Sequence, residues 1–404
     1  MTAPGGPRHR DDLWDLTDWQ AGLRAQFPIL TAHPDLAYLD SAATAQKPRA
    51  VLDAVRTYLT TTNANAGRGT YPWANRTTAL VEQARDRVRG FLRDPAPQRS
   101  AVHFTGGTTE GLRTVARDWL PALLCDGDEI VVPHADHRAN IEPWLEVQRH
   151  LARQGTRIHV LPMPYQRSSG DYDHHALAEL AGPRTRFVAV THVHHVYGAD
   201  MNIHRVRRAV GPDAVICLDA AQSIGHMPVS VAELDVDFVV FSGHKCLALP
   251  GSGAVWARQE RGPGFAPGGW QGTPNTVGIV SLAAALDWLD GAGTDRVARW
   301  TTALAARLTD GLRRLDAFEV IGCRASLAAD SPVQRRQGIV TFRHRDIPSG
   351  DLGFVLYDRG FMVRSDHHCQ GGEGELDASV RVSAHLYNTV EEIDRLLTVL
   401  ADLG

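Results

Sequence analysis

The sequence lacks the features that mark several large classes of protein. Its 404 residues include five cysteines, and none belongs to a C-x-x-C pair, so neither a disulfide framework nor a zinc ribbon is indicated. The longest apolar stretches, such as 279–289, are too short and too polar to cross a bilayer. Residues 1–12 are polar and lack the apolar core of a secretory signal. We therefore expect reduced thiols, no membrane contact and a cytoplasmic location.

An excess of positive charge is also missing. The formal net charge of −4 gives no broad basic field, so nucleic acid is not an expected partner. His192, His194 and His195 cluster, and the His-His-Cys run at 367–369 could add ligands, but the paired spacing of a metal site is absent. We therefore expect no metal site. No internal repeat or low-complexity tract is present.

What the sequence does contain is an alternation of short apolar runs with helical patterns. Strands are expected at 101–105, 129–133, 157–161, 186–193, 214–218 and 237–241, with helices between them. This order is typical of an α/β fold in which a mainly parallel sheet carries helices on both faces.

The length of the chain predicts two linked domains. Helical patterns at 279–288 and 296–315 precede a change to shorter elements, so we place the boundary near residue 290. We expect 1–26 to form a flexible lead and a helix that packs with the small domain, and 27–289 to form the large domain. Residues 290–404 then form a smaller α+β carboxyl-terminal domain, with strands expected near 338–343 and 361–364 and a final amphipathic helix at 390–403.

Two expected strands are followed by residues that suit an aldehyde cofactor. Asp219 follows the run 214–218, and Lys245 follows the run 237–241 after a Ser-Gly-His step. Open α/β sheets bind ligands at the carboxyl ends of their parallel strands. A lysine there can form a Schiff base with pyridoxal 5′-phosphate (PLP), and an acidic partner can keep the pyridine nitrogen protonated. The alternative is an ordinary surface lysine and a turn aspartate.

An expected helix start upstream can bind the phosphate of such a cofactor. Thr108 and Thr109 follow two glycines, at a point where backbone N–H groups and the helix dipole attract an anion. Ser242 and His244, beside the lysine, can also bind phosphate and orient the ring. An ordinary helix cap is the alternative for the threonines, and both interpretations can hold together.

Several segments, in order along the chain, resemble a known family. They are Asp136-His137-Arg-Ala-Asn140-Ile-Glu-Pro-Trp, Asp219-Ala-Ala-Gln222, Ser242-Gly-His244-Lys245, Thr273-Pro-Asn, Val-Arg364-Ser-Asp-His-His-Cys369 and Arg381-Val-Ser-Ala-His-Leu-Tyr-Asn. Together they resemble the class V aminotransferase group of PLP enzymes, most closely the SUF-type (group II) cysteine desulfurases and selenocysteine lyases, over about residues 27–400. The resemblance implies the PLP-dependent transferase fold type I, with a seven-stranded sheet.

The resemblance also implies a role for each matching residue. The catalytic residues would be Lys245, Cys369 as the sulfur-accepting nucleophile, and His137, which would stack on the pyridine ring and take part in proton transfer. Cofactor contacts would come from Thr108, Thr109, His137, Asp219, Gln222, Ser242, His244, Lys245 and Thr273. Substrate contacts would come from Arg381, Arg364, His195 and Asn140, and the amino-terminal family-like segment from Tyr38 and Asp40 onward would help to line the mouth of the site. Because the family's threonine reaches the phosphate of the neighbouring subunit, Thr273 implies a homodimer.

The residue types suit these roles chemically. A thiol near histidines and a basic residue can be held partly as the reactive thiolate, as Cys369 would require. A guanidinium such as that of Arg381 can grip a carboxylate by a bidentate pair. The alternatives are a structural cysteine, a surface ion pair for Arg381 and a surface loop histidine for His137.

The implied reaction converts L-cysteine to L-alanine and leaves the sulfur on Cys369 as a persulfide for a sulfur-acceptor protein. Three departures from the family pattern affect access to the site. His195 stands in place of an asparagine, Gly67 in place of a histidine, and the segment 262–270 is shorter. Two other functions therefore stay open. One is a diverged PLP-dependent lyase, epimerase or transferase that acts on another amino acid in a specialised biosynthetic pathway, and the other is a non-catalytic sulfur-transfer scaffold.

Overall fold

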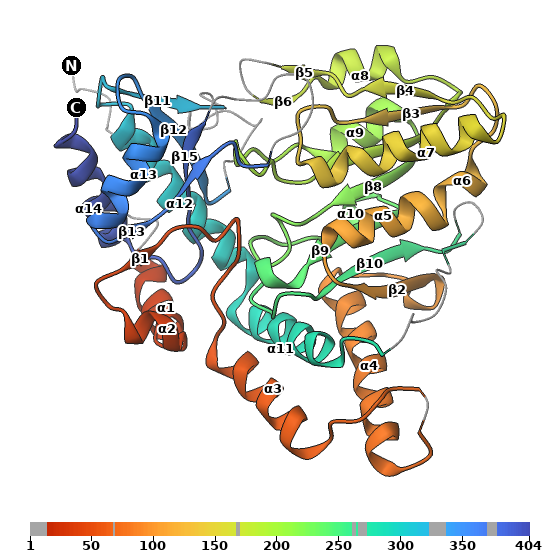
Figure 1. Cartoon of the computed structure of the whole chain (residues 1–404), viewed down its shortest axis with the longest axis horizontal. Helices are drawn as coiled ribbons and strands as arrows, with labels where there is room; N and C mark the ends of the chain where they lie inside the picture. The colour runs from red at the N-terminus through yellow and green to blue at the C-terminus, as the bar shows by residue number, and fades with distance from the viewer. Residues whose placement is uncertain are drawn as a thin grey trace, which may run out of the picture.

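Seven strands form the central sheet of the protein (Figure 1). A computed structural model describes residues 14–67, 69–166, 170–260, 264–265, 273–322, 337–369 and 378–404. The strand order is β2 (Ser100–Thr105), β10 (Gly253–Arg258), β9 (Phe238–Ser242), β8 (Val215–Asp219), β7 (Thr185–Thr191), β3 (Glu129–Val132) and β4 (His159–Pro162). Strand β10 runs antiparallel to both of its neighbours, and the pairs from β9 to β4 are parallel. The predicted mainly parallel sheet is confirmed.

Alternate residues of each strand pack on opposite faces of this sheet. In β8, Val215 and Cys217 join one apolar cluster, whereas Ile216 and Leu218 join another. Helices α5 (Thr108–Asp118), α6 (Leu120–Leu123) and α7 (Glu142–Arg153) contribute to the first cluster. The second cluster takes residues from α3 (Arg49–Thr61), α4 (Pro72–Phe91), α8 (His174–Leu180), α9 (Ile203–Val210), α10 (Val231–Leu234) and α11 (Thr276–Ala292). Because both faces are covered, the strands read as continuous apolar runs in the sequence.

The carboxyl-terminal residues form a second sheet, which is antiparallel throughout. Its order is β11 (Phe318–Ile321), β12 (Ile339–His344), β15 (Ser379–Ser383) and β14 (Arg364–Asp366). Helices α12 (Thr294–Leu312), α13 (Ser349–Asp358) and α14 (Val390–Ala401) share a third apolar cluster with this sheet. In Figure 1 this part lies beside the central sheet, and α12 runs between the two.

One strand of the carboxyl-terminal part differs from its prediction. The expected strand at 361–364 is two strands, because the chain changes partner within it. Strand β13 (Phe361–Met362) pairs in parallel with β1 (Ala37–Tyr38), whereas β14 pairs with β15. A change of partner strand leaves no local pattern in the sequence, so a single strand was the natural prediction.

The amino-terminal segment packs against the carboxyl-terminal part (Figure 1). Leu16 of α1 (Trp14–Arg24) lies in the third apolar cluster, and the Arg24 guanidinium lies 2.8 Å from the Glu392 carboxylate. Ala37 of β1 also belongs to this cluster, although the prediction assigned it to the large domain. The predicted limits put β1 in the large domain, whereas its side chain at Ala37 packs with the carboxyl-terminal part.

Several elements had no counterpart in the prediction. They include α2 (Pro28–Ala32), α3, α4, β5 (Tyr165–Gln166), β6 (Asp171–Tyr172), α8, α13, strands β11 and β15, and the short 3-10 turns η2 (Pro97–Arg99), η3 (Arg138–Asn140) and η4 (Gly243–Lys245). The helix expected at 203–210 matches α9, and the one expected at 390–403 matches α14 to within two residues. Among the described residues, no helix combines the length and the apolarity needed to cross a membrane.

Candidate active site

A cavity of about 260 Å³ lies at the carboxyl ends of the parallel strands. Most of the predicted site residues line it, namely Thr108, Thr109, His137, His195, Asp219, Gln222, Ser242, His244, Lys245, Arg364, Cys369 and Arg381. Strand ends and helix starts of the central sheet supply the first nine, and the last three come from the carboxyl-terminal part. The fold therefore gathers one site from both parts of the molecule.

Asp219 is the last residue of β8, and the pairing of the strands sets its place. It lies opposite Thr191 of β7 and Val240 of β9, so it stands in the middle of the sheet. Its Oδ1 accepts a hydrogen bond from the Ala221 N–H at 2.9 Å. Burial raises the pKa of this carboxyl, while the Ala221 N–H and the charge of Lys245 oppose the rise.

Lys245 lies in η4, directly after β9, and its amine is less basic than that of an ordinary lysine. Burial, together with the nearby charge of Arg381, lowers its pKa to about 8, while the charge of Asp219 acts in the opposite direction. A substantial share of unprotonated amine near neutral pH follows, and the unprotonated form is the nucleophile and base.

The start of α5 faces the cavity next to the end of β9. The Thr108 N–H donates to Ser242 Oγ at 2.7 Å, and the Thr108 hydroxyl lies at the same distance from that oxygen. Gly107, just before the helix, has φ +150°, and a Cβ there would lie 3.1 Å from Ser242 Oγ. Only glycine therefore permits this close approach of β9 to the helix start. The anion site expected at Thr108 and Thr109 opens toward the cavity.

Two neutral imidazoles form one wall of the cavity. The His137 and His195 rings lie 5.3 Å apart between centroids, at 81° to each other. Burial lowers the pKa of His137 to about 4, with further lowering by Lys245, and burial holds the pKa of His195 well below its usual value. Within the described part of the chain, Nε2 of His195 is buried and makes no hydrogen bond.

A buried network behind these rings was not predicted. His194 Nδ1 accepts from two backbone N–H groups at 3.2 Å each, so the proton of the neutral ring lies on Nε2. That nitrogen is 3.1 Å from the Ala135 carbonyl and 3.3 Å from Asp136 Oδ1. Tyr172 donates to Asp136 Oδ2 at 3.2 Å. Burial raises the pKa of Asp136 to about 7 and lowers that of His194 to about 4.

This network orients the histidine wall, because the His194 ring stacks on His195 at 5.0 Å between centroids. Asp136 stood in the family-like segment beside His137, but no sequence pattern connected it with His194. The two residues meet because β3 and β7 are neighbours in the sheet.

Arg381, in β15, is buried and held in place from two sides. One guanidinium nitrogen donates to the His195 carbonyl at 3.1 Å, and the other donates to Asp40 Oδ1 at 3.2 Å. Its Nε is buried and has no hydrogen-bond partner in the described structure. Asp40 was predicted only to line the mouth of the site, so its pairing with Arg381 is an addition. Burial raises the pKa of Asp40, and Arg381 opposes that rise.

Arg364 lies beside Cys369 and already has an acidic partner. Its Nε donates to both carboxylate oxygens of Asp366, at 2.9 and 2.8 Å, and its Nη2 donates to Cys369 Sγ at 3.3 Å. The pKa of Arg364 is raised, mainly by this hydrogen bond with Asp366. The expected contact of Arg364 with substrate would therefore compete with Asp366.

The backbone around Cys369 is unusual. Cys369 has φ +57° and His368 has φ +55°, values that non-glycine residues seldom adopt. The Arg138 N–H donates to the Cys369 carbonyl at 3.4 Å, which joins this turn to the loop after β3. His368 also lines the cavity, although no role was predicted for it, and its Nε2 lies 2.9 Å from Ser379 Oγ. Burial lowers the pKa of His368 to about 3.

Two predicted site residues do not line the cavity. Asn140 is fully buried, and its Oδ1 accepts from the Trp144 indole N–H at 3.2 Å, so it supports the fold beneath the site. Thr273 is exposed. Its neighbour Gly272, Arg68 of the amino-terminal family-like segment, Cys323 and most of 262–270 lie outside the described residues. No group of three or more His, Cys, Asp or Glu side chains within the described ranges is placed to hold a metal ion.

Comparison with known proteins assigns the family. The model of the family described as "Aminotransferase class-V" matches residues 37–396. The chain belongs to this family. Similar relatives include a cysteine desulfurase of Cronobacter sakazakii, 33% identical over 409 residues that cover 94% of this chain and 96% of the relative. A probable cysteine desulfurase of Streptomyces coelicolor is 34% identical, with coverage of 95% and 96%.

Solved structures agree with this assignment. A cysteine desulfurase from Thermococcus onnurineus has a TM-score of 0.82 and 26% identity, and the match covers 95% of this chain and 97% of that one. A cysteine desulfurase from Escherichia coli has a TM-score of 0.78 and 29% identity, with coverage of 95% and 98%. The predicted resemblance to PLP enzymes of the cysteine desulfurase type is confirmed, and the fold is that of these enzymes.

Members of this family are PLP-dependent enzymes, and so is this chain. The residues at the cavity fit the cofactor. The start of α5 with Gly107 and Thr108 suits a phosphate, and Asp219 faces the same cavity from the sheet. Gln222 donates from Nε2 to the Ala42 carbonyl at 2.9 Å, and its buried Oε1 has no hydrogen-bond partner among the described residues. Such an unpaired polar atom on the wall is expected where a polar ligand binds.

Proposed function

We propose that the enzyme is a cysteine desulfurase that converts L-cysteine to L-alanine and holds the released sulfur on Cys369 as a persulfide. The single observation that carries the proposal is that Cys369 shares one cavity with Lys245 and Asp219. A thiol that faces the reacting amino acid can attack its sulfur directly. The family match and the relatives named above support the same activity.

Each residue of the site has its own role in the proposed reaction. When bound at Lys245, PLP supplies an electron sink for the charge left as the substrate Cα loses its proton. Once the substrate amine has taken its place at the cofactor, the freed Lys245 amine would accept that proton, and its lowered pKa keeps more of the amine unprotonated and ready to do so. Asp219 would keep the ring nitrogen of the cofactor protonated. The neutral imidazole of His137 would contact the ring without adding a positive charge.

Sulfur transfer requires a thiolate on the substrate side of the cavity. The Cys369 thiolate attacks the substrate sulfur, so an S–S bond forms and the C–S bond of the substrate breaks. The electron pair of that bond stays with the carbon skeleton, which is then protonated to give alanine. Arg364 Nη2 donates a hydrogen bond to Cys369 Sγ at 3.3 Å and so helps to position the sulfur.

Arg381 is the proposed clamp for the substrate carboxylate. Its guanidinium is buried, and its Nε is free of partners in the described structure. Asp40 and the His195 carbonyl hold the other nitrogens, so the group is oriented before the substrate arrives. His195 would add a donor from Nε2 on the same side.

The proposal also includes a homodimer and a sulfur-acceptor protein. Thr273 is exposed and lies off the cavity of its own subunit, which agrees with a role in the neighbouring site of a homodimer. A sulfur-acceptor protein would receive the persulfide from Cys369, which is itself exposed. The cytoplasmic location stays a prediction.

A second candidate function is a PLP-dependent lyase, epimerase or transferase for another amino acid. It is favoured by His195, whose larger ring occupies the position of the family's asparagine at the cavity wall. Such an enzyme would turn over its substrate without Cys369. A non-catalytic scaffold is disfavoured, because Lys245, Asp219 and the phosphate site meet in one cavity.

Incubation of the PLP-loaded protein with L-cysteine and a reductant tests the proposal. Alanine and sulfide are quantified for the wild type and for Cys369→Ala. We expect equal amounts of both products from the wild type and, from the variant, retention of PLP with loss of both products. Products from the variant would exclude Cys369 as the sulfur carrier. No alanine from either protein would favour the second candidate function.

A further inference from the structure

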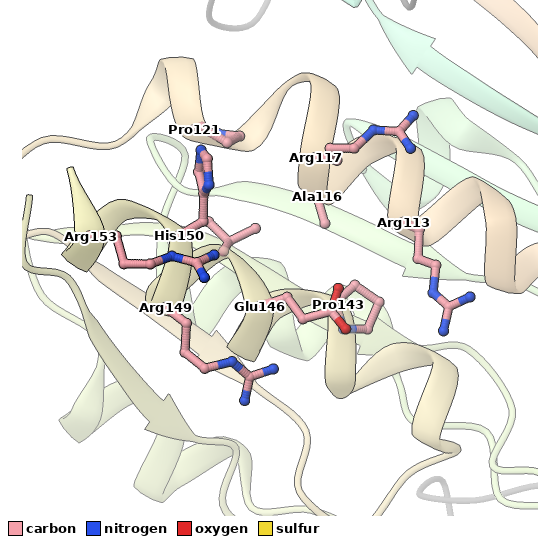
Figure 2. Close-up of a pocket in the computed structure, with 10 residues that line it drawn as sticks. Arg113, Ala116, Arg117, Pro121, Pro143, Glu146, Arg149, His150 and Arg153 are labelled. Carbon is pink, nitrogen blue, oxygen red and sulfur yellow. The ribbon is translucent and has the colours of Figure 1, made fainter.

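A second cavity lies between the outer surfaces of α5 and α7 and shares no lining residue with the first. Its volume is about 360 Å³. Figure 2 shows the side chains that line it, and we call it the α5–α7 groove. Arg113 and Arg117 come from α5, and Arg149, His150 and Arg153 come from α7.

The groove concentrates positive charge that the chain does not neutralise. Among the described residues that line it, Glu146 alone is acidic. Arg117 pairs with Asp118 at 2.6 Å. Arg113, Arg149 and Arg153 are exposed, and within the described ranges their side chains form no hydrogen bond or ion pair. In a chain of net charge −4, an unpaired cluster of this kind points to an external anion.

The arrangement of the arginines indicates an extended anion. Arg113 and Arg117 are one helical turn apart on α5, and Arg149 and Arg153 are one turn apart on α7. In Figure 2 the guanidinium groups of Arg113, Arg117 and Arg149 end at separate places and do not converge on one point. A compact anion could therefore contact few of them at once, whereas a chain with several carboxylates could contact them in turn.

A second copy of this chain is a poor occupant of the groove. In a two-fold symmetric contact the same surface faces itself, so the arginine rows of one copy would meet those of the other. Like charges at short range oppose such a contact. The occupant must instead carry negative charge that this surface lacks.

We propose that the α5–α7 groove docks an acidic segment of a partner protein. Helix α7 spans about 18 Å, a length covered by about six extended residues of such a segment. The helix follows η3, where the Arg138 N–H holds the Cys369 carbonyl at 3.4 Å. A docked partner is thus placed beside the turn that carries Cys369. That this partner receives sulfur rests on the proposed function, whereas the docking itself does not.

Fluorescence anisotropy with a labelled acidic peptide tests the docking. The probe is a peptide of about eight residues that alternates glutamate and serine, long enough to span the groove. It is titrated with the PLP-loaded wild type and with the double variant Arg113→Glu/Arg149→Glu. The matched control, Arg208→Glu/Arg345→Glu, makes the same change in net charge at two exposed arginines elsewhere. Arg113→Gln/Arg149→Gln serves if charge reversal impairs folding.

We expect the wild type and the matched control to bind the peptide equally, with binding that weakens as salt rises. Loss of two exposed ion pairs should weaken binding to the groove variant by roughly tenfold, and the glutamine variant should bind several-fold more weakly than the wild type. An equal loss in the matched control would overturn the proposal, since net charge alone would then explain it.

Three further results would also overturn it. Inorganic tripolyphosphate could displace the peptide when it is added at the same total concentration of negative charge as the peptide. That result would identify a compact anion as the ligand. Tighter binding of a single-stranded oligonucleotide would identify nucleic acid. A change of oligomeric state in the groove variants would identify a contact between copies. The formation of alanine and sulfide in the presence of a reductant does not depend on the groove. The anisotropy assay can therefore fail while the desulfurase assay succeeds, or the reverse, and the two failures are distinguishable.

Discussion

Lys245 illustrates how a single position acquires its chemistry from its surroundings. The residue lies in the turn η4 that follows β9, and burial lowers its pKa to about 8. A lysine with an unprotonated amine can attack an aldehyde, which an ordinary surface lysine does only slowly near neutral pH.

Replacement of Lys245 by alanine should abolish the covalent link to PLP. The purified Lys245→Ala protein should lack the yellow absorbance of lysine-bound PLP, and borohydride reduction should label no peptide. In the wild type the label should lie on the Lys245 peptide. Lys47→Ala is the control, because Lys47 does not line the cavity and should leave the absorbance unchanged. A normal absorbance in Lys245→Ala would contradict the assignment.

Asp136 is a second residue whose state depends on burial. Its pKa of about 7 lies above the usual value for aspartate, so the folded protein holds a proton that the unfolded chain releases. This group therefore favours folding at low pH. The contribution is lost as the pH rises from about 4 to about 7.

Asp136→Asn should remove this pH dependence, because the amide keeps an acceptor for Tyr172 but cannot ionise. We expect the stability of the wild type, relative to Asp136→Asn, to fall by an amount on the order of a few kcal/mol between pH 5 and pH 8. Urea unfolding of both proteins at the two pH values measures it. Asp358→Asn, at an exposed site, should show no such change. A wild type that gains relative stability with pH would indicate an ionised Asp136 paired with His194.

At the scale of elements, the start of α5 depends on how closely β9 approaches it. Gly107 has φ +150°, and its missing Cβ leaves room for Ser242 Oγ, which accepts the Thr108 N–H. The strand and the helix thus shape the anion site together.

Gly107→Ala should weaken PLP binding by at least about tenfold, because the methyl group displaces Ser242 from Thr108. Titration of the apoprotein with PLP measures the affinity. Gly127→Ala introduces similar backbone strain at φ +82°, with no neighbouring atom within 4 Å of the new Cβ. The control should lose about 1 kcal/mol of stability while keeping its PLP affinity. Equal PLP affinities of the two variants would show that the Gly107 contact does not matter.

At the scale of the whole molecule, the site depends on chain segments that are far apart in sequence. Arg381 and Cys369 reach the cavity from the carboxyl-terminal part, and Asp40 reaches it from the amino-terminal segment beside β1. The proposed homodimer would add Thr273 from the partner.

Mixing of two inactive variants tests the dimer. Lys245→Ala lacks the lysine of its own site, and Thr273→Ala should lack the phosphate contact that it provides to its partner. A mixed dimer contains one site with both residues intact, so refolding the two together should restore about a quarter of the wild-type sites. Alanine formation measures the recovery. The mixture should stay as inactive as its components if Thr273 acts within its own subunit.

The sequence predicted the sheet well and the contacts of the site less well. Apolar runs such as the one that became β8 are visible because burial on both faces leaves no polar residue in them. The division of the strand at 361–364 was missed, since it depends on which strands are neighbours. Arg364 was predicted to meet substrate, but its pairing with Asp366 depends on side-chain geometry within β14.

The amino-acid sequence alone determined the α/β fold and the family, and it indicated which residues would hold PLP, because strand periodicity and motifs can be read from the order of residues in a chain. Tertiary structure decided the rest. The proton position on His194, the pKa of Asp136, the pairing of Arg381 with Asp40 and the arginines of the α5–α7 groove all depend on distances between segments that are separate in the sequence. Electrostatic interactions depend on those distances and on burial, and neither is encoded in local spacing.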